Sequence, residues 1–246
     1  MTSATSPGAS ATSPEAAATA PVGRPRSGGR QRPGGTPREE ILDAAAELFT
    51  SRGYAATSTR MIADAVGVRQ ASLYYHFTSK EEILEELLAG TVRPSLALAA
   101  ALKTDAAPPE TQLFSLAAFD TGVLCGGRWN LGALYLLPEV RGDRFTRFRG
   151  ERAELRAAYV DLIRNLVNQS RPTPDPHPAP DPDLTDPDQA DELADLVFGL
   201  VESVITIRSE REVVDVEAMA QRVAAGCLRL VGVPTTRTTA AVKPSP

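Results

Sequence analysis

The segment from Gly67 to Phe77 is the part of the chain best equipped to contact another molecule through polar side chains. It reads GVRQASLYYHF and ends on two tyrosines, a histidine and a phenylalanine in consecutive positions, although aromatic residues make up only 5% of the chain. A guanidinium, an amide, hydroxyls and an imidazole can each hydrogen-bond to an anionic or polar partner. The base edges and phosphates of nucleic acid present such groups.

Groups suited to catalysis or metal binding are scarce by comparison. The two histidines, His76 and His177, belong to no ligand cluster, and the two cysteines, Cys125 and Cys227, lie too far apart for a metal motif or a disulfide framework. The chain also lacks a nucleophile elbow and a phosphate-binding glycine loop. We therefore expect no enzymatic activity, no metal and no cofactor, with both cysteines reduced and buried.

Charge is distributed unevenly along the chain. The net charge is −5, but the first 38 residues hold five arginines against one glutamate, a charge of +4 that leaves −9 for the remainder. No apolar run approaches the length of about 20 residues needed to cross a bilayer, and the first residues lack the pattern of a signal peptide. We expect a cytoplasmic protein without a membrane partner. Its basic N-terminal arm is expected to contact an anionic partner.

Helix-capping motifs predict where the ordered part of the chain begins. Residues 1–35 are rich in Ser, Thr, Pro and Gly and are expected to be disordered. Thr36, followed by Pro37 and then by Glu39, forms a capping box, and a helical stripe of apolar residues comes next. Gly53 is expected to end this helix in a left-handed conformation.

Two short helices on either side of a glycine follow this first helix. One is expected to begin at residues 57–59 and to stop at Gly67, and the next covers residues 70–76. A glycine between two short helices is typical of a helix-turn-helix, so residues 36–80 are predicted to form such a domain. A second capping box at residues 79–82 begins a fourth helix that reaches about residue 103, with a kink or an end at Pro94.

The remainder of the chain is also predicted to be helical. Helices are expected over residues 109–124, 129–137, 139–168, 190–208 and 215–231. A loop rich in proline and aspartate covers residues 171–188, and residues 234–246 are expected to be disordered. The predicted fold is therefore all-α, with a helix-turn-helix domain followed by a larger helical domain over residues 81–233.

The first domain resembles the tetracycline-repressor (TetR) family of transcription regulators over about residues 38–88. The resemblance rests on motifs that read ILxAAxxLF from Ile41, AVGV from Ala65, LYYHF from Leu73 and SKEEIL from Ser79. It implies a helix-turn-helix that binds double-stranded operator DNA, with residues 70–76 as the recognition helix in the major groove.

The resemblance also implies which side chains touch DNA. Gln70 would pair with adenine and Ala71 would pack on a thymine methyl group, while Lys80 and the backbone amides beside it would hold a phosphate. The full set of expected contacts is Thr59, Arg60, Arg69, Gln70, Ala71, Ser72, Tyr74, Tyr75, His76 and Lys80.

Several of these assignments have structural alternatives. Tyr74 or Tyr75 can instead pack inside the small domain, and His76 or Lys80 can be merely solvated. Arg69 stands where the family often has a small capping serine, so the third helix gives up a cap that contributes about 1 kcal/mol. Its positive charge would lie near the DNA, where Arg69 can contact either a base or a phosphate.

The helical second domain of this family binds a small molecule and pairs two subunits, and the resemblance implies both here. The remaining aromatic rings favour an apolar pocket with a few polar anchors. The expected pocket residues are Phe114, Phe119, Trp129, Asn130, Tyr135, Phe148 and Tyr159. The expected dimer contacts, on the last two helices, are Leu196, Gly199, Leu200, Ser203, Val223, Gly226, Cys227 and Leu230.

Together these features predict a homodimeric repressor that a small, largely hydrophobic effector releases from its operator. The ligand would favour a conformation whose recognition helices no longer match successive major grooves, and the fourth helix would transmit the change. An activator of the same family, or a DNA-binding protein without a small-molecule ligand, is the alternative. The segment at residues 23–26, GRPR, either follows the minor groove or is an inert tail.

Overall fold

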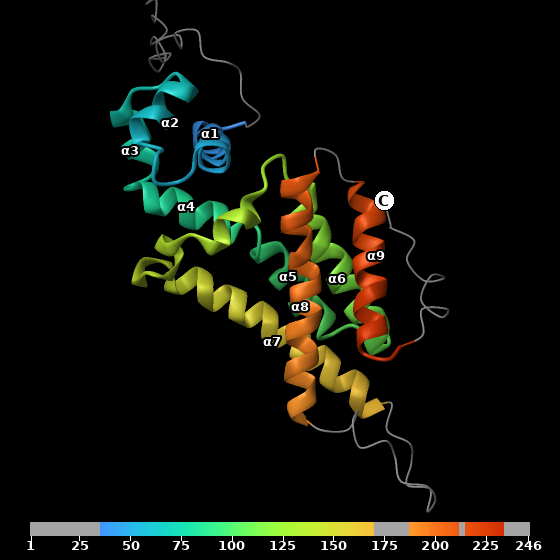
Figure 1. The fold of residues 1–246 in the computed structure, drawn as a ribbon. Coiled ribbons are helices and arrows are strands. Elements are labelled where there is room, and N and C mark those ends of the chain that lie inside the picture. The colour runs from blue at the N-terminus through green and yellow to red at the C-terminus, as the bar shows by residue number, and fades with distance from the viewer. Residues whose placement is uncertain (1–34, 170–186, 212–214, 234–246) are drawn as a thin grey trace, which may run out of the picture.

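The computed structural model describes residues 35–169, 187–211 and 215–233 (Figure 1). Over these residues every regular element is a helix, in agreement with the predicted all-α fold. Helices α1, α2 and α3 gather at one end of the molecule, and α4 runs from them toward the remaining helices (Figure 1). The predicted arm, nearly all of the predicted loop at residues 171–188 and the predicted tail lie outside the described residues.

The helices follow one another along the chain with short connections. In order they are α1 (Pro37–Arg52), α2 (Thr59–Val66), α3 (Gln70–His76), α4 (Lys80–Ala89), α5 (Arg93–Leu102), α6 (Pro109–Gly126), the 3-10 helices η1 (Leu131–Leu136), η2 (Pro138–Arg141) and η3 (Asp143–Phe145), α7 (Thr146–Gln169), α8 (Pro187–Glu210) and α9 (Val216–Leu230).

Helix α1 begins with the predicted capping box. Thr36 Oγ1 accepts from the Glu39 N–H, and the Glu39 carboxylate accepts from the Thr36 N–H at 3.0 Å. Gly53 ends α1 with a positive φ of 87°, which favours glycine, but its ψ of 151° lies outside the left-handed helical region, so the expected αL cap is not formed. Gly67, with φ 74° and ψ 28°, supplies the left-handed turn between α2 and α3.

Helix α4 joins the two halves of the molecule. Ser79 caps it by accepting from the Glu82 N–H, but the Glu82 carboxylate bonds to the N–H and the hydroxyl of Thr78, so the second capping box is only half formed. The helix expected as far as residue 103, with a kink or an end at Pro94, is two helices, α4 and α5. The break falls before Pro94, which lies in the first turn of α5, because proline fits a first turn better than a helix interior.

An apolar core holds α1, α2, α3 and α4 together. It is built from side chains that recur at helical spacing, and nearly all of them lie within one connected cluster. In this part of the chain the largest fully buried members are Ile41, Phe49, Ile62, Leu73, Phe77, Ile83, Leu84 and Leu88.

The second half of the molecule is a bundle in which α6 lies between its neighbours. Helix α6 packs against α5, α7, α8 and α9, and α7 packs along α8. In Figure 1, α8 and α9 stand beside one another along one side of the bundle. The predicted helices at residues 109–124, 190–208 and 215–231 therefore match α6, α8 and α9 closely.

The segment between α6 and α7 departs from the prediction. The expected helices at 129–137 and 139–168 are instead three short 3-10 helices followed by α7, which begins at Thr146. Pro138 and Gly142 interrupt the segment, and Gly132 lets η1 lie against α8. A side chain at Gly132 would place its Cβ 2.6 Å from side-chain atoms of Ile205, so a larger residue there would force the Ile205 side chain or the helices to shift.

Candidate nucleic-acid interface and ligand pocket

Helix α3 separates buried side chains from exposed ones. Leu73 and Phe77 lie in the core, while Gln70, Ala71 and Ser72 are exposed. Tyr75 is 87% exposed. Its ring contacts the ring of His76 edge-on at 5.3 Å between centroids. The packed alternative for Tyr75 is therefore wrong, because the ring stands in solvent where a second molecule can reach it.

A short hydrogen-bond chain links the exposed side of α3 to α2. Gln70 Nε2 donates to Thr59 Oγ1 at 2.9 Å, and the Thr59 hydroxyl lies 3.1 Å from the Tyr74 hydroxyl. Tyr74 is 47% exposed, so it lies at the edge of the domain and is not packed inside it. The chain orients the Gln70 amide and leaves its Oε1 and its second amide hydrogen for another partner.

Lys80 makes bonds inside the first domain that the sequence did not indicate. Its ammonium donates to the carbonyl oxygens of Tyr54 and Thr57, both at 2.9 Å, and lies 4.1 Å from the centre of the Tyr54 ring. These bonds fix the turn between α1 and α2, from which α2 starts. The ammonium is therefore not merely solvated. It uses two of its three hydrogens to hold this turn, which leaves one for a phosphate, so the DNA contact implied for Lys80 stays a prediction.

The remaining basic candidates stand at the rim of the same surface. Arg69 is exposed and makes no side-chain cap for α3, as the sequence predicts. Arg60 is exposed and lies 4.0 Å from Asp64, one turn along α2. An exposed pair of this kind is weak and easily exchanged for another anion. His76 is half-buried.

A cavity of about 350 Å³ lies in the second half of the molecule, between η1, η2, α7 and α8. Of the predicted pocket residues, Tyr135 and Phe148 line it, with ring centroids 5.4 Å apart. Sequence reasoning missed the polar part of its lining and several apolar members. The further lining residues are Gly132, Ala133, Leu136, Val140, Arg141, Arg149, Arg152, Glu202, Ile205 and Thr206.

The other predicted pocket residues have different surroundings. Phe114 and Tyr159 are buried in the core, and Phe119 is 44% exposed on α6. Trp129 and Asn130 precede η1 and contact other elements. These five residues do not line the cavity between η1 and α8, so the predicted aromatic set is scattered.

Two side chains of opposite charge also line this cavity. Arg152 of α7 makes a two-pronged ion pair with Glu202 of α8: Nε donates to Oε1 at 2.9 Å and Nη2 donates to Oε2 at 2.5 Å. The Arg152 guanidinium also lies 5.0 Å from the Phe198 ring centre and 5.6 Å from that of Tyr135. The pair thus ties α7 to α8 beside the apolar part of the lining.

A buried carboxyl group lies deeper in the bundle. Asp120 of α6 accepts hydrogen bonds from Ser95 Oγ at 2.8 Å and from the Tyr159 hydroxyl at 3.1 Å. Burial raises the pKa of Asp120 to about 6, against the opposing effect of these two hydrogen bonds. Burial raises the pKa of Tyr159 as well. The neutral acid is therefore favoured inside the bundle far more than in water.

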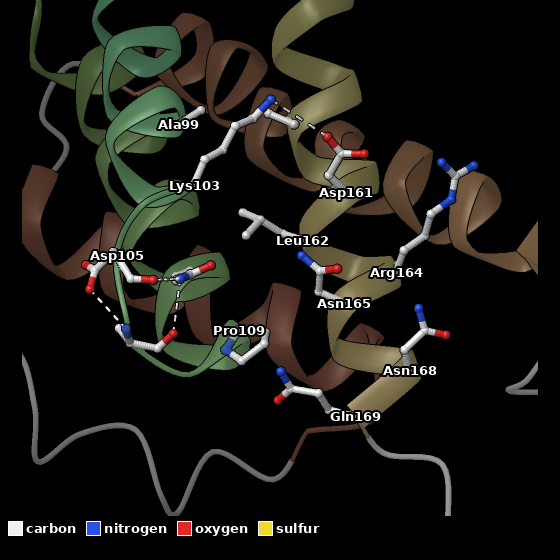
Figure 2. A pocket seen from close by; sticks show the side chains of 13 residues that line it. Ala99, Lys103, Asp105, Pro109, Asp161, Leu162, Arg164, Asn165, Asn168 and Gln169 are labelled. Carbon is white, nitrogen blue, oxygen red and sulfur yellow. Dashed lines mark hydrogen bonds and ion pairs between the residues drawn. The ribbon is translucent and has the colours of Figure 1, made fainter.

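A larger and more polar hollow of about 590 Å³ lies between the α5–α6 connection and the end of α7. Figure 2 shows Lys103 of α5 pointing across it toward Asp161 of α7, at 3.9 Å. Gln112 donates its amide hydrogens to the backbone carbonyls of Asp105 and Ala107. The amide-rich rim holds no aromatic ring among its described residues, and no sequence motif pointed to it.

Direct bonds connect the two halves of the molecule. Trp129 Nε1 donates to Asp43 Oδ1 of α1 at 2.8 Å, and Arg128 lies 3.6 Å from the same carboxylate. The adjoining Asn130 donates to the Ile205 carbonyl of α8 at 2.8 Å. The stretch before η1 therefore contacts α1 on one side and α8 on the other.

A second set of bonds runs through ion pairs. Arg38 of α1 pairs with Glu86 of α4 at 3.2 Å, and Glu86 lies 3.9 Å from Arg93 of α5. Arg93 in turn bonds both oxygens of Glu151 on α7 at 3.1 Å. The helix-turn-helix is thus connected to α7 by alternating charges.

The predicted dimer contacts divide into exposed and buried groups. Leu196 is 58% exposed and Leu230 is 40% exposed, and both are large apolar side chains on α8 and α9. Gly199, which is on α8, is also exposed. Val223 and Cys227, in contrast, are buried against neighbouring helices of the same chain. These two side chains offer no surface to a partner, and that part of the prediction needs correction.

Other kinds of site have no counterpart among the described residues. No group of three or more His, Cys, Asp or Glu side chains is placed to hold a metal ion there, and Cys125 and Cys227 are free thiols in the interior. None of the helices in the described ranges is both long enough and apolar enough to cross a bilayer.

Comparison with known proteins places the first domain among regulators. A family profile described as "Bacterial regulatory proteins, tetR family" matches residues 41–87. The transcriptional repressor KstR2 of Rhodococcus jostii is 55% identical over 53 residues, which are 22% of this chain and 26% of that protein. This chain therefore aligns with about a quarter of the length of that repressor.

Solved structures extend the likeness to the whole fold. The crystal structure of AmtR from Mycobacterium smegmatis is 50% identical to this chain, with a TM-score of 0.71, over 83% of this chain and 90% of that one. The structure of the ketosteroid transcriptional regulator KstR2 of Mycobacterium tuberculosis is 25% identical, with a TM-score of 0.61 over 80% of this chain and 93% of that one.

Proposed function

Because this chain belongs to the tetR family of bacterial regulatory proteins, a family of DNA-binding transcription regulators, we propose that it is a homodimeric repressor released from operator DNA by a small molecule. One observation carries the DNA-binding part. The outward side of α3 exposes an amide, hydroxyls and Tyr75, while its inner side is locked into an apolar core. A rigid helix with an adaptable polar surface is what a major groove requires.

The bonding of Gln70 supports a particular reading of the groove. One amide hydrogen is held by Thr59, which leaves one N–H and the Oε1 atom. Adenine offers N7 as an acceptor and its N6 amino group as a donor, and these match that remaining pair. Guanine offers two acceptors and fits it poorly. The Ala71 methyl group, exposed on the next position, suits a neighbouring thymine methyl.

Pairing of two chains follows from the geometry of DNA and from the exposed surface of α8 and α9. One α3 contacts only a few base pairs, whereas a dimer reads two half-sites about 34–36 Å apart. Leu196 and Leu230 leave apolar area in water, and the small Gly199, Ser203 and Gly226 lie on the same two helices. We place the dimer contact on this surface, without Val223 and Cys227.

The effector site in this proposal is the cavity between η1, η2, α7 and α8. An apolar wall with a few polar groups is the usual form of a small-molecule site. The stretch before η1 bonds to α1 through Trp129 and Asp43, so a ligand that moves η1 also strains that contact. Such a ligand favours the conformation that does not match DNA. The repressor names of KstR2 relatives favour repression over activation.

The proposal is tested by selecting bound sequences from random double-stranded DNA with the full chain. The enriched site should consist of two inverted half-sites, and sedimentation of the complex should give an even number of chains per site. The Leu196→Glu variant, which places a charge in the proposed dimer surface, should sediment as a monomer and lose enrichment. A lack of enriched sequence for the wild-type chain would contradict the proposal.

A further inference from the structure

The wall of the cavity between η1, η2, α7 and α8 combines apolar surface with positive charge. The apolar part comes from Tyr135, Val140 and Phe148, and from Leu136, which is 84% exposed. A large aliphatic side chain left in water beside a cavity is a surface that an apolar ligand can cover. The volume of about 350 Å³ lies within the range of small-molecule sites.

Three guanidinium groups line this cavity against one carboxylate. Arg152 and Glu202 form an ion pair, so their charges compensate each other. Arg149 donates only to neutral oxygens: the carbonyls of Val140 at 2.8 Å and Gly142 at 2.6 Å, and a threonine hydroxyl. Arg141 is exposed at the cavity. Neither Arg141 nor Arg149 forms an ion pair with another described residue.

From this arrangement we infer that the cavity takes an amphipathic anion, with an apolar body against Tyr135, Leu136 and Phe148 and a carboxylate between Arg141 and Arg149. Guanidinium groups bind planar oxyanions through two parallel hydrogen bonds. A ligand carboxylate would form charge-assisted hydrogen bonds with these guanidinium groups, while its apolar body covers the wall. The charge excess selects an anion over a cation or a neutral body of equal size.

The polar hollow at the end of α7 provides a contrast within the same domain. There Lys103 faces Asp161 at 3.9 Å, and Arg164 is held by Asp191 at 2.7 Å. The basic groups are thus matched by acidic ones, and the described lining has no aromatic ring (Figure 2). Of these two hollows, it is the cavity beside η1 that joins unmatched positive charge to an apolar wall.

The inference rests on the proposed function for its regulatory consequence, but the binding itself can be measured without DNA. Trp129 is the only tryptophan of the chain, and it lies just before η1 with its N–H on Asp43. Its fluorescence therefore reports on the segment that lines the cavity and on the contact with α1 at the same time.

The test is titration of the full chain with decanoate, decan-1-ol and decyltrimethylammonium, followed by Trp129 fluorescence and calorimetry. These probes share a ten-carbon body and differ in head-group charge. Decanoate should bind about ten-fold more tightly than decanol, the change expected for one charge-assisted hydrogen-bonded contact, and the cation should bind most weakly. Failure of decanoate to bind, or equal binding of the three probes, would overturn the inference.

Variants locate the site. Arg141→Gln should weaken decanoate binding by about ten-fold and leave decanol binding unchanged. Arg144→Gln is the matched control, because Arg144 is also exposed in the same segment but does not line the cavity. Equal effects of the two variants would overturn the assignment. Arg141 is exposed and pairs with no acidic side chain of the described residues, so its loss should leave unfolding unchanged.

DNA binding in the same samples separates this inference from the proposed function. If decanoate binds through Arg141 and selected DNA is released, both stand. If decanoate binds through Arg141 while DNA affinity stays constant, the anion site stands and the ligand-responsive part of the proposed function fails. If the unliganded chain selects no DNA, the repressor proposal fails whatever decanoate does.

Discussion

The two halves of the molecule place their polar chemistry in opposite ways. In the helix-turn-helix, polar side chains stand outside an apolar core, and seven consecutive residues of α3 present most of them. In the second half, polar groups lie inside: Asp120 is buried with Ser95 and Tyr159, and the cavity joins residues as distant as Tyr135 and Glu202. A DNA-contacting surface can come from one short segment of the chain, whereas the lining of a pocket comes from segments that lie far apart in the sequence.

The two arrangements also differ in how far a substitution is expected to lower the free energy of unfolding. Exposed groups on α3 can change with little effect on folding, because their hydrogen bonds already compete with water. Buried groups and close contacts in the bundle cannot be changed without altering stability, since the buried groups have lost their water and the interior is densely packed. Substitutions on the two sides of α3, and then within the bundle, therefore probe this contrast.

The inner side of α3 should give the greatest loss of stability. Phe77→Ala removes a fully buried ring and should lower the free energy of unfolding by about 3–5 kcal/mol. Tyr75→Ala, two residues away on the exposed side, should change it by less than about 0.5 kcal/mol. Urea unfolding followed by circular dichroism measures both. Similar losses in the two variants would mean that α3 has no distinct outer side.

The next largest loss of stability should come from a steric clash at the contact between η1 and α8. Gly132→Ala places a methyl group 2.6 Å from Ile205 and should cost about 1–3 kcal/mol of stability. Gly150→Ala on α7 is the control, since no neighbouring atom lies within 4 Å of the added methyl group; it should stabilise by about 0.5–1 kcal/mol through helix propensity. Thermal unfolding distinguishes the two signs, and a neutral Gly132→Ala would refute the close approach.

Asp120 should make stability depend on pH. Its pKa is raised to about 6 in the folded chain, so the folded state binds this proton more tightly than the unfolded chain does. The stabilising effect of the proton is present at low pH and is lost as the pH rises through about 6. Asp120→Asn removes this loss, so the variant should gain roughly 1–1.5 kcal/mol on the wild-type chain between pH 5 and pH 7.5.

The quantity to measure is the difference in unfolding free energy between Asp120→Asn and the wild-type chain at each pH. Taking this difference removes the contribution of other acids such as Glu82, whose pKa is lowered by hydrogen bonds from Thr78. A difference that does not change between pH 5 and pH 7.5 would show that the carboxyl group of Asp120 is solvated and not buried.

The contact between the halves should matter least for folding. Trp129→Phe keeps an aromatic ring but removes the N–H that bonds Asp43, and it should lower stability by about 1 kcal/mol. Its effect on regulation should be larger than its effect on folding, because the release of DNA by ligand passes through this bond in our proposal. A variant that retains full ligand response would exclude Trp129 from the coupling.

The sequence was informative where the cause of structure is local. Thr36, Ser79 and Gly67 act on neighbours within a few residues, so the ends of α1, α4 and α2 could be predicted. The same holds for α3, whose predicted bounds of residues 70–76 match the structure. The bonds that Lys80 makes inside the domain could not be predicted, because the carbonyls that accept them lie 23 and 26 residues away in the chain.

The pocket could not be predicted because its parts become neighbours only after folding. Tyr135 and Phe148 stood out as rings in a chain with few of them. Nothing in the local sequence marks Arg149 or Arg152 as part of a pocket, and Glu202, the partner of Arg152, lies 50 residues away. The segment of 3-10 helices was also missed: the prediction placed a break at Pro138 but continued a regular helix across Gly142.

Whether the outward side of α3 reads DNA is decided by the affinity of Gln70→Ala and Tyr75→Ala chains for the selected operator. Fluorescence anisotropy at fixed salt, with sedimentation and urea unfolding on the same samples, gives affinity, assembly and stability together. We predict a loss of about 1–3 kcal/mol in binding free energy with the dimer and its unfolding unchanged. Wild-type affinity in both variants, or loss of the dimer before loss of DNA binding, would contradict this role for α3.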